Sequence, residues 1–251
     1  MIIHEREHEF VMVAQHDHAH VSRDAAQWWR DDYFLGIDKK ESVVLAVREH
    51  DRCWIEPDEE PLWNEHTQQP YSFMDYPGSP KLAFYKEGID EIVQMDPYAG
   101  LLCSLHYGSF LKDATSTIGK NFWVAEKHRQ QKLLNELGIA NDKTLSFHLN
   151  LLKFCDNLSL YICLNDPGTP KDQEHYFYRE GFPQRFSFAD EKPIHARWLD
   201  QETVSLSISP FKKELHVTLP FKAVEKEQIK DIGLAAAFQN SPILYREVTY
   251  L

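Results

Sequence analysis

The chain has 251 residues, of which 43% are hydrophobic and 13% aromatic, and this content is enough for one large hydrophobic core, which excludes a disordered protein. Its formal net charge of -12 at pH 7 and its lack of long basic runs argue against a nucleic-acid partner, because phosphate backbones are bound by clustered lysine and arginine. No apolar stretch reaches the roughly 18 to 20 residues of a membrane span and no apolar signal core opens the chain, so we expect a cytoplasmic protein without a membrane partner.

The first two thirds of the chain have mainly helical spacing. A β-prone run at 9–14 predicts an opening strand, and helices are expected at 17–34, 40–53, 97–113, 119–137 and 143–165. Asp96 followed by Pro97 is a helix start, and Gly138 is a helix stop. The segment 55–82 is rich in proline and aromatic residues and has no clear period. It is expected either to cover a pocket beside the preceding helix or to be a surface loop packed by its own rings.

The last third changes to a period of two. Apolar and polar residues alternate at 203–208 and again at 215–219, which predicts a hairpin, and further strands are expected at 194–199 and 244–249. These strands predict a small antiparallel β-sheet that packs on the helices, and the N-terminal strand is a candidate to join it. We therefore expect one domain over 1–251, mainly α (α+β), with a helical core at 15–165 and a β-rich appendage at 185–251.

Asp156 lies on the apolar face of its predicted helix. Positions 145, 149, 152, 156 and 159 share that face, so the pattern carries a carboxylate toward the core. Burying an ionised carboxylate without a partner costs about several kcal/mol, so the group must be neutralised, paired or bound to a metal. The sequence therefore predicts a partner for Asp156 elsewhere in the chain.

Two other predicted helices point polar side chains inward. The stripe of Val43, Val47, His50 and Trp54 carries the adjacent pair His50-Asp51 into the protein, and His18 faces inward from the first turn of its helix. Imidazole and carboxylate ligands together suit a divalent ion such as manganese, iron, cobalt, nickel, zinc or magnesium. The predicted metal ligands are His18, His50, Asp51 and Asp156.

Simpler interpretations stay open for each of these residues. His16 and His20 are alternatives to His18 as the ligand from the first helix. A single inward histidine is more often hydrogen-bonded to a carbonyl group, and either aspartate could pair with an arginine. The ordered set of four is the observation that favours a metal site.

The chain order His, His-Asp, Asp resembles that of the HD superfamily of metal-dependent phosphohydrolases. The phrases QHDHA at 15–19 and HDRCW at 50–54 more closely resemble an uncharacterised bacterial family within or near that superfamily. The resemblance covers roughly residues 10–165. It implies an HD-type helical bundle, a divalent metal ion held by His18, His50, Asp51 and Asp156, and hydrolysis of a phosphoester.

His106 is a further candidate, because it lies in the strongly apolar helix 97–113. The resemblance implies that an extra histidine there can hold a second metal or assist catalysis, so Asp51 and His106 are the candidate catalytic residues. A divalent ion lowers the pKa of bound water and polarises a phosphoryl oxygen. The expected function is metal-dependent hydrolysis of a small phosphoester, either a nucleotide or a phosphorylated metabolite.

Other functions fit parts of the sequence. The chain could be a non-catalytic metal- or ligand-binding protein with an HD-like core. A strand followed by His16-x-His18-x-His20 resembles the first motif of metal-dependent amidohydrolases, but residues 80–165 lack the strand-helix alternation of their barrel. The same cluster resembles metallo-β-lactamase ligands, but Val21-Ser22 stands where those proteins have Asp-His.

Overall fold

Helices form the body of the protein. The computed structural model describes residues 1–140 and 142–251. All five helices expected from the sequence are present, as α1 (Gln15–Gln27), α2 (Lys40–Glu49), α5 (Pro97–Phe110), α6 (Thr117–Leu137) and α7 (Lys143–Leu164). The expected helix start at Asp96 is confirmed, because its side chain accepts hydrogen bonds from backbone amides in the first turn of α5. The expected helix end at Gly138 is confirmed as well, because this residue ends α6 in the left-handed conformation.

One long helix, α4 (Gly78–Met95), was not predicted from the sequence. It follows a short helix, α3 (Ile55–Glu59), and a two-stranded sheet of β3 (Trp63–Asn64) and β4 (Gln69–Pro70). Pro80 and Gly88 interrupt its apolar pattern, although Tyr85, Ile89 and Ile92 are buried at helical spacing. Gly88 allows close packing, because a Cβ at this position would lie only 2.6 Å from the Cβ of Cys53.

The sheet is larger than expected and takes strands from both ends of the chain. Its order is β1-β2-β7-β8-β6-β5, and only the β6–β8 pair is parallel. The strands are β1 (Ile2–Glu5), β2 (Glu9–Val13), β5 (Ala196–Trp198), β6 (Thr203–Leu206), β7 (Leu215–Glu225) and β8 (Leu244–Tyr250). The opening strand does join this sheet, as β2 paired with β7.

Two expectations about the fold are therefore wrong. The protein has an α+β fold with a six-stranded mixed sheet, instead of an HD-type helical bundle with a small antiparallel sheet. The predicted hairpin of 203–208 with 215–219 does not form, because β8 lies between β6 and β7. An alternating pattern shows that a segment is a strand and which face is buried, but it does not show which strand lies beside it.

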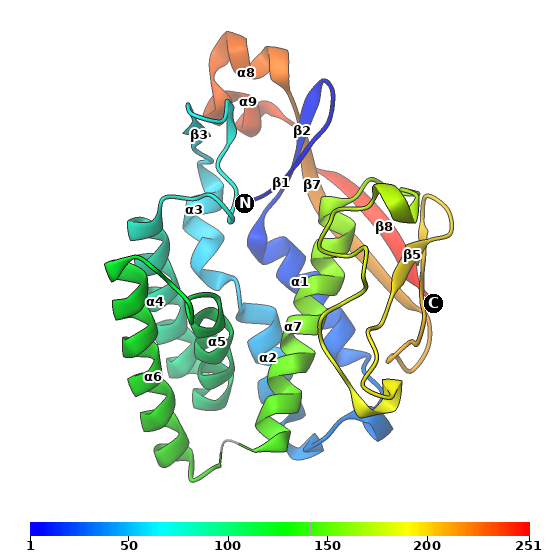
Figure 1. The fold of residues 1–251 in the computed structure, drawn as a ribbon. Helices are drawn as coiled ribbons and strands as arrows, with labels where there is room; N and C mark the ends of the chain where they lie inside the picture. Colours follow the sequence, from blue (N-terminus) through cyan, green and yellow to red (C-terminus); the bar gives the residue numbers. More distant parts are fainter. Residues whose placement is uncertain (141) are drawn as a thin grey trace.

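The elements are arranged in layers (Figure 1). Helices α4, α5 and α6 lie side by side on one side of the molecule, α1, α2 and α7 are central, and the sheet lies on the other side. Helix α1 contacts β7 and α7 contacts β1, so these two helices connect the sheet to the helical layer. No helix within 1–140 or 142–251 is both long and apolar enough to cross a membrane.

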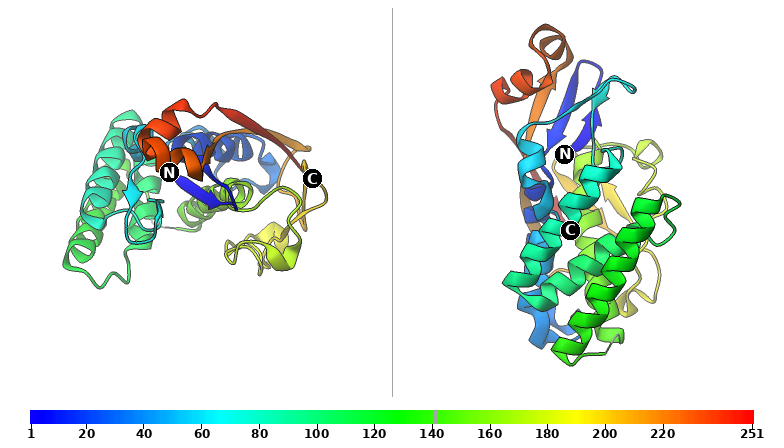
Figure 2. Two further views of the ribbon diagram at one scale, coloured as in Figure 1. Left: turned by 90° about the horizontal axis from the view of Figure 1, so that it is seen from above. Right: turned by 90° about the vertical axis from the view of Figure 1, so that its left-hand side faces the viewer.

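A second, smaller apolar cluster lies at one end of the molecule. Helices α8 (Lys226–Ile232) and α9 (Leu234–Asn240) contact β7 there, at the end of the molecule where the β1–β2 hairpin also lies (Figure 2). Phe10 and Met12 of β2 pack against Ile229 and Leu234 of these helices. The main core is separate from this cluster and extends between the helices and the sheet around Trp29, Phe154 and Tyr161.

Candidate metal centre

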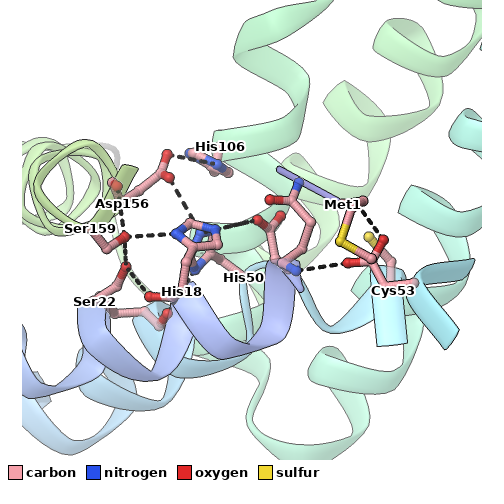
Figure 3. Close-up of polar contacts among 12 residues, drawn as sticks. Met1, His18, Ser22, His50, Cys53, His106, Asp156 and Ser159 are labelled. Carbon is pink, nitrogen blue, oxygen red and sulfur yellow. Dashed lines mark hydrogen bonds and ion pairs between the residues drawn. The ribbon is translucent and has the colours of Figure 1, made fainter. Parts of the chain in front are cut away.

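Five side chains that the sequence singled out meet in one buried place (Figure 3). His18 comes from α1, His50 and Asp51 from the turn after α2, His106 from α5 and Asp156 from α7. Their potential ligand atoms form two groups that share His50: His18, His50 and Asp51, and His50, His106 and Asp156. Within each group the atoms lie within 4.8 Å of one another. These buried groups could hold a metal ion.

His18 is the one histidine of the 16–20 cluster that belongs to these groups. It is fully buried, between Asp51 and Ser159. His16 and His20 lie next to each other, with ring centroids 4.6 Å apart, and neither belongs to a potential metal-binding group. Successive residues of a helix are about 100° apart, so residues two positions from His18 point nearly the opposite way.

The end of α2 fixes the orientation of His50. The helix ends at Glu49, and the Nδ1 atom of His50 donates to the carbonyl oxygen of Val47 at 2.7 Å. This bond satisfies one of the carbonyl groups that a helix leaves unpaired at its C-terminus. In the neutral ring, whose proton is on Nδ1, the Nε2 atom carries a lone pair.

That Nε2 atom has no hydrogen-bond partner among the described residues, although it is buried. It lies 3.6 Å from Asp51 Oδ2 and 3.6 Å from Asp156 Oδ1. Both distances are too long for hydrogen bonds, and a lone pair between two carboxylate oxygens is repulsive. The geometry therefore requires a positive charge between these three atoms, either a proton or a metal ion.

The pKa values of the clustered side chains also favour a positive charge beside the two carboxylates. Burial lowers the pKa of His50, but the carboxylates of Asp51 and Asp156 outweigh burial and raise it to about 9. Burial raises the pKa of Asp51 and Asp156, but the neighbouring histidines, with His50 foremost, together outweigh burial and lower both pKa values, and the hydroxyl group of Tyr107 adds to this effect at Asp51. Burial lowers the pKa of His106 to about 4, so this ring is neutral at neutral pH and free to bind a cation.

Within each of the two groups, the donor spacing is close to that of the ligands of a divalent ion. Two donors that each lie about 2.1 Å from an ion are about 3.0 Å apart at a right angle and about 3.4 Å apart at a tetrahedral angle. The observed distances are 2.8 Å between His18 Nε2 and Asp51 Oδ2, 3.6 Å from His50 Nε2 to each carboxylate, and 3.7 Å between His106 Nε2 and Asp156 Oδ2. Small movements would bring these atoms to ligand distances.

Outer hydrogen bonds hold the first group. Asp51 Oδ1 accepts from the hydroxyl group of Tyr107 at 2.7 Å, which leaves Oδ2 toward the two histidines. His18 Nδ1 lies 2.7 Å from Ser159 Oγ, which also contacts Ser22 Oγ at 2.7 Å and donates to the carbonyl oxygen of Asp156. Such partners of ligand residues orient them and tune the affinity for the metal.

Sequence reasoning missed these outer partners. Ser159 could have been found, because it is a polar residue on the same apolar face as Asp156. Tyr107 gives no such signal, because α5 is buried on nearly every side and its spacing has no preferred direction.

A cavity of about 340 Å³ opens onto the cluster. Asp51, His106 and Asp156 line it, together with aromatic side chains from several elements. Phe73 and Lys81 from the segment 55–82 line this cavity, and so does Phe177 from the loop after α7. Trp63 instead borders another cavity of about 510 Å³ beside α8 and α9, which contains none of the predicted ligands.

Arg48 and Arg52, the arginines beside His50 and Asp51, are not among the residues that line the cavity. Arg48 pairs with Glu49, and Arg52 pairs with Glu49 and Glu91. Lys81, from the first turn of α4, is the one lysine or arginine among the residues that line the cavity. It was missed because α4 itself was missed.

The fold and the cluster define an α+β protein with a buried His-Asp centre that opens into a small cavity. The chain belongs to DUF3891, a family of proteins of unknown function, whose model matches residues 1–226. Searches of curated proteins and of solved structures found no similar protein. The expected membership of the HD superfamily is therefore wrong, because no HD-domain family matches. A ligand order of His, His-Asp, Asp can arise wherever three helices surround a site, so it does not define a fold.

Proposed function

We propose that this protein is a metal-dependent hydrolase of a small phosphoester, with a divalent ion held by His18, His50, Asp51 and Asp156. The observation that carries the proposal is the buried Nε2 atom of His50, which faces two carboxylates without a hydrogen-bond partner among the residues described. A divalent ion would bind all three groups at once, whereas a single proton on Nε2 can make a well-aligned hydrogen bond to only one of the two carboxylates.

The side chains divide the work as follows. The carbonyl oxygen of Val47 orients His50, and the hydroxyl group of Tyr107 orients Asp51. The Nε2 atom of His50 and the Oδ2 atom of Asp51 therefore remain for the ion. The donor set of imidazoles and carboxylates suits manganese, iron, cobalt, nickel, zinc or magnesium. When bound, such an ion would lower the pKa of a bound water and would act as a Lewis acid toward a phosphoryl oxygen.

His106 is the candidate for proton transfer or for an additional ligand. Its ring lines the cavity, and its Nε2 atom lies 3.7 Å from Asp156 Oδ2. Burial lowers its pKa to about 4, so at neutral pH the ring accepts a proton or binds the ion and has no proton beyond the neutral state to donate. It is therefore assigned to water activation or to the ion, and not to protonation of the leaving group.

The cavity favours a small substrate. A volume of about 340 Å³ is near the lower end of the range for small-molecule sites. Tyr85, Phe110 and Phe177 give its wall aromatic surface against which a ring can pack. The net charge of -12 repels polyanions, so a nucleotide or a phosphorylated metabolite fits better than a polymer.

The test is elemental analysis of protein purified without a chelator, followed by assays on phosphomonoesters, phosphodiesters and nucleotides with the ion restored. Asp156→Ala removes a proposed ligand, and His16→Ala removes a neighbouring histidine outside both groups. We expect bound metal and turnover in the wild type and in His16→Ala, and neither in Asp156→Ala. Metal without turnover of any phosphoester would favour a binding protein, and wild-type protein that binds no divalent ion would refute the metal centre.

A further inference from the structure

Lys81 is placed unusually for a charged side chain. It is half-buried and lines the same cavity as Asp51, His106 and Asp156. Its ammonium group donates to the carbonyl oxygens of Phe73 at 3.1 Å and Met74 at 3.4 Å. No carboxylate of a described residue lies within ion-pair distance of it, whereas the half-buried ammonium group of Lys171 pairs with Glu174 at 2.7 Å.

The two carbonyl groups hold the ammonium group without neutralising it. An ammonium group has three donors, so at least one remains for another acceptor. Burial lowers the pKa of Lys81, which reflects the cost of partly desolvating a charge that has no close counter-ion. Asp75 is near enough to raise the pKa of Lys81, but it does not form an ion pair with the ammonium group, so a position for a closer anion remains on the cavity side.

The charges around the cavity show when an anion would bind. The charged lining residues are the carboxylates of Asp51 and Asp156 and the ammonium group of Lys81, which together give a formal charge of -1. One divalent ion in the centre changes this charge to +1. Without Lys81 the loaded cavity would be neutral, so the ion and Lys81 are both needed for a positive site.

We propose that Lys81 is the second anchor of the substrate and binds the oxygens of its phosphoryl group, while the His-Asp centre binds the same group through the ion. This assignment rests on the proposed function for the identity of the anion. The substrate is therefore an anion, and the cavity binds it only when the His-Asp centre holds the metal. Lys81 is thus a binding residue that nothing in the sequence pattern indicated.

The test uses inorganic phosphate as the probe and isothermal titration of the manganese-loaded, full-length protein. Lys81→Gln removes the charge, Lys81→Arg keeps it, and Lys86→Gln is the matched control on the same helix, where Lys86 pairs with Asp90. We expect Lys81→Gln to weaken phosphate binding about tenfold or more, with Lys86→Gln unchanged and Lys81→Arg partly restored. Metal stoichiometry and melting temperature should be unaffected, and the KM for a hydrolysed phosphoester should rise more than kcat falls.

The outcomes separate this inference from the proposed function. Phosphate binding that needs both manganese and Lys81 supports the inference, even if no phosphoester is hydrolysed and the hydrolase proposal fails. Wild-type phosphate affinity in Lys81→Gln overturns it, even if the protein proves to be a hydrolase. Loss of metal from Lys81→Gln, or no phosphate binding by the loaded wild type, also overturns it.

Discussion

Replacing Tyr107 by phenylalanine distinguishes a metal centre from a metal-free hydrogen-bond network. The substitution keeps the ring, which is buried and packs on Tyr85 with 4.0 Å between centroids, and removes only the hydroxyl group that donates to Asp51 Oδ1 at 2.7 Å. A hydrogen bond to a buried charged group contributes about 1.5 to 3 kcal/mol. Loss of an outer partner of a ligand typically weakens metal affinity by about 10- to 100-fold.

The assay is competition for the ion with a chromophoric chelator, together with thermal unfolding in the presence and absence of EDTA. We expect Tyr107→Phe to bind the ion about 10- to 100-fold more weakly than the wild type. Tyr85→Phe is the matched control, because Tyr85 lines the same cavity and its hydroxyl group makes no side-chain hydrogen bond to a described residue. This control should bind the ion as the wild type does.

A metal-free network would respond differently. The Tyr107→Phe protein would then lose about 1.5 to 3 kcal/mol of stability with EDTA and without EDTA alike. Equal metal affinity in Tyr107→Phe and Tyr85→Phe, with stability lowered in the first alone, would refute the role of Asp51 as an oriented ligand.

Three further predictions follow from the same geometry. Asp156→Ala should lose bound metal, as measured by elemental analysis, and unchanged metal stoichiometry would exclude Asp156 as a ligand. The free energy of unfolding of the EDTA-treated variant should be about 3 to 5 kcal/mol lower than that of the wild type, because His50 loses a buried partner. In the metal-free protein, the raised pKa of His50 contributes stability that is fully present below the unfolded-state pKa of about 6.5 and is lost as the pH rises to about 9. The melting temperature with EDTA should therefore fall over this pH range, and a flat profile would contradict the charge assigned to His50. Gly88→Ala should destabilise the protein by about 1 to 3 kcal/mol in chemical denaturation, because its methyl group meets Cys53; wild-type stability would show that the contact between α4 and Cys53 relaxes at no cost.

Helical spacing predicted the burial of several polar residues, although it did not indicate others, such as Glu126 and His148. His18, His50 and Asp156 each stand where an apolar residue is expected, Asp51 adjoins His50, and all four are buried in the structure. His106 was found for the same reason, as the polar residue of a strongly apolar helix. A side chain that violates the local pattern is visible in the sequence because burial of polar groups is costly.

Pairing between distant segments could not be predicted in this way. β6 and β7 have clear alternation, yet β8 from the far end of the chain lies between them. The resemblance to the HD superfamily failed for a related reason, because it rested on the order of four ligands and not on how the helices pack. Lys81 shows a third limit, since a lysine near the start of an unrecognised helix looks like any solvated side chain.

The sheet joins the first and last parts of the chain, which has a consequence for synthesis on the ribosome. Phe10 of β2 pairs with Val224 of β7, and at about 5 to 20 residues per second this partner follows about 10 to 40 s later. Until then the β1–β2 hairpin has an unpaired edge that carries the apolar residues 10–13. The helices that bear the His-Asp centre are complete well before β7 emerges, so the nascent chain can assemble its centre while its first hairpin still needs protection from aggregation.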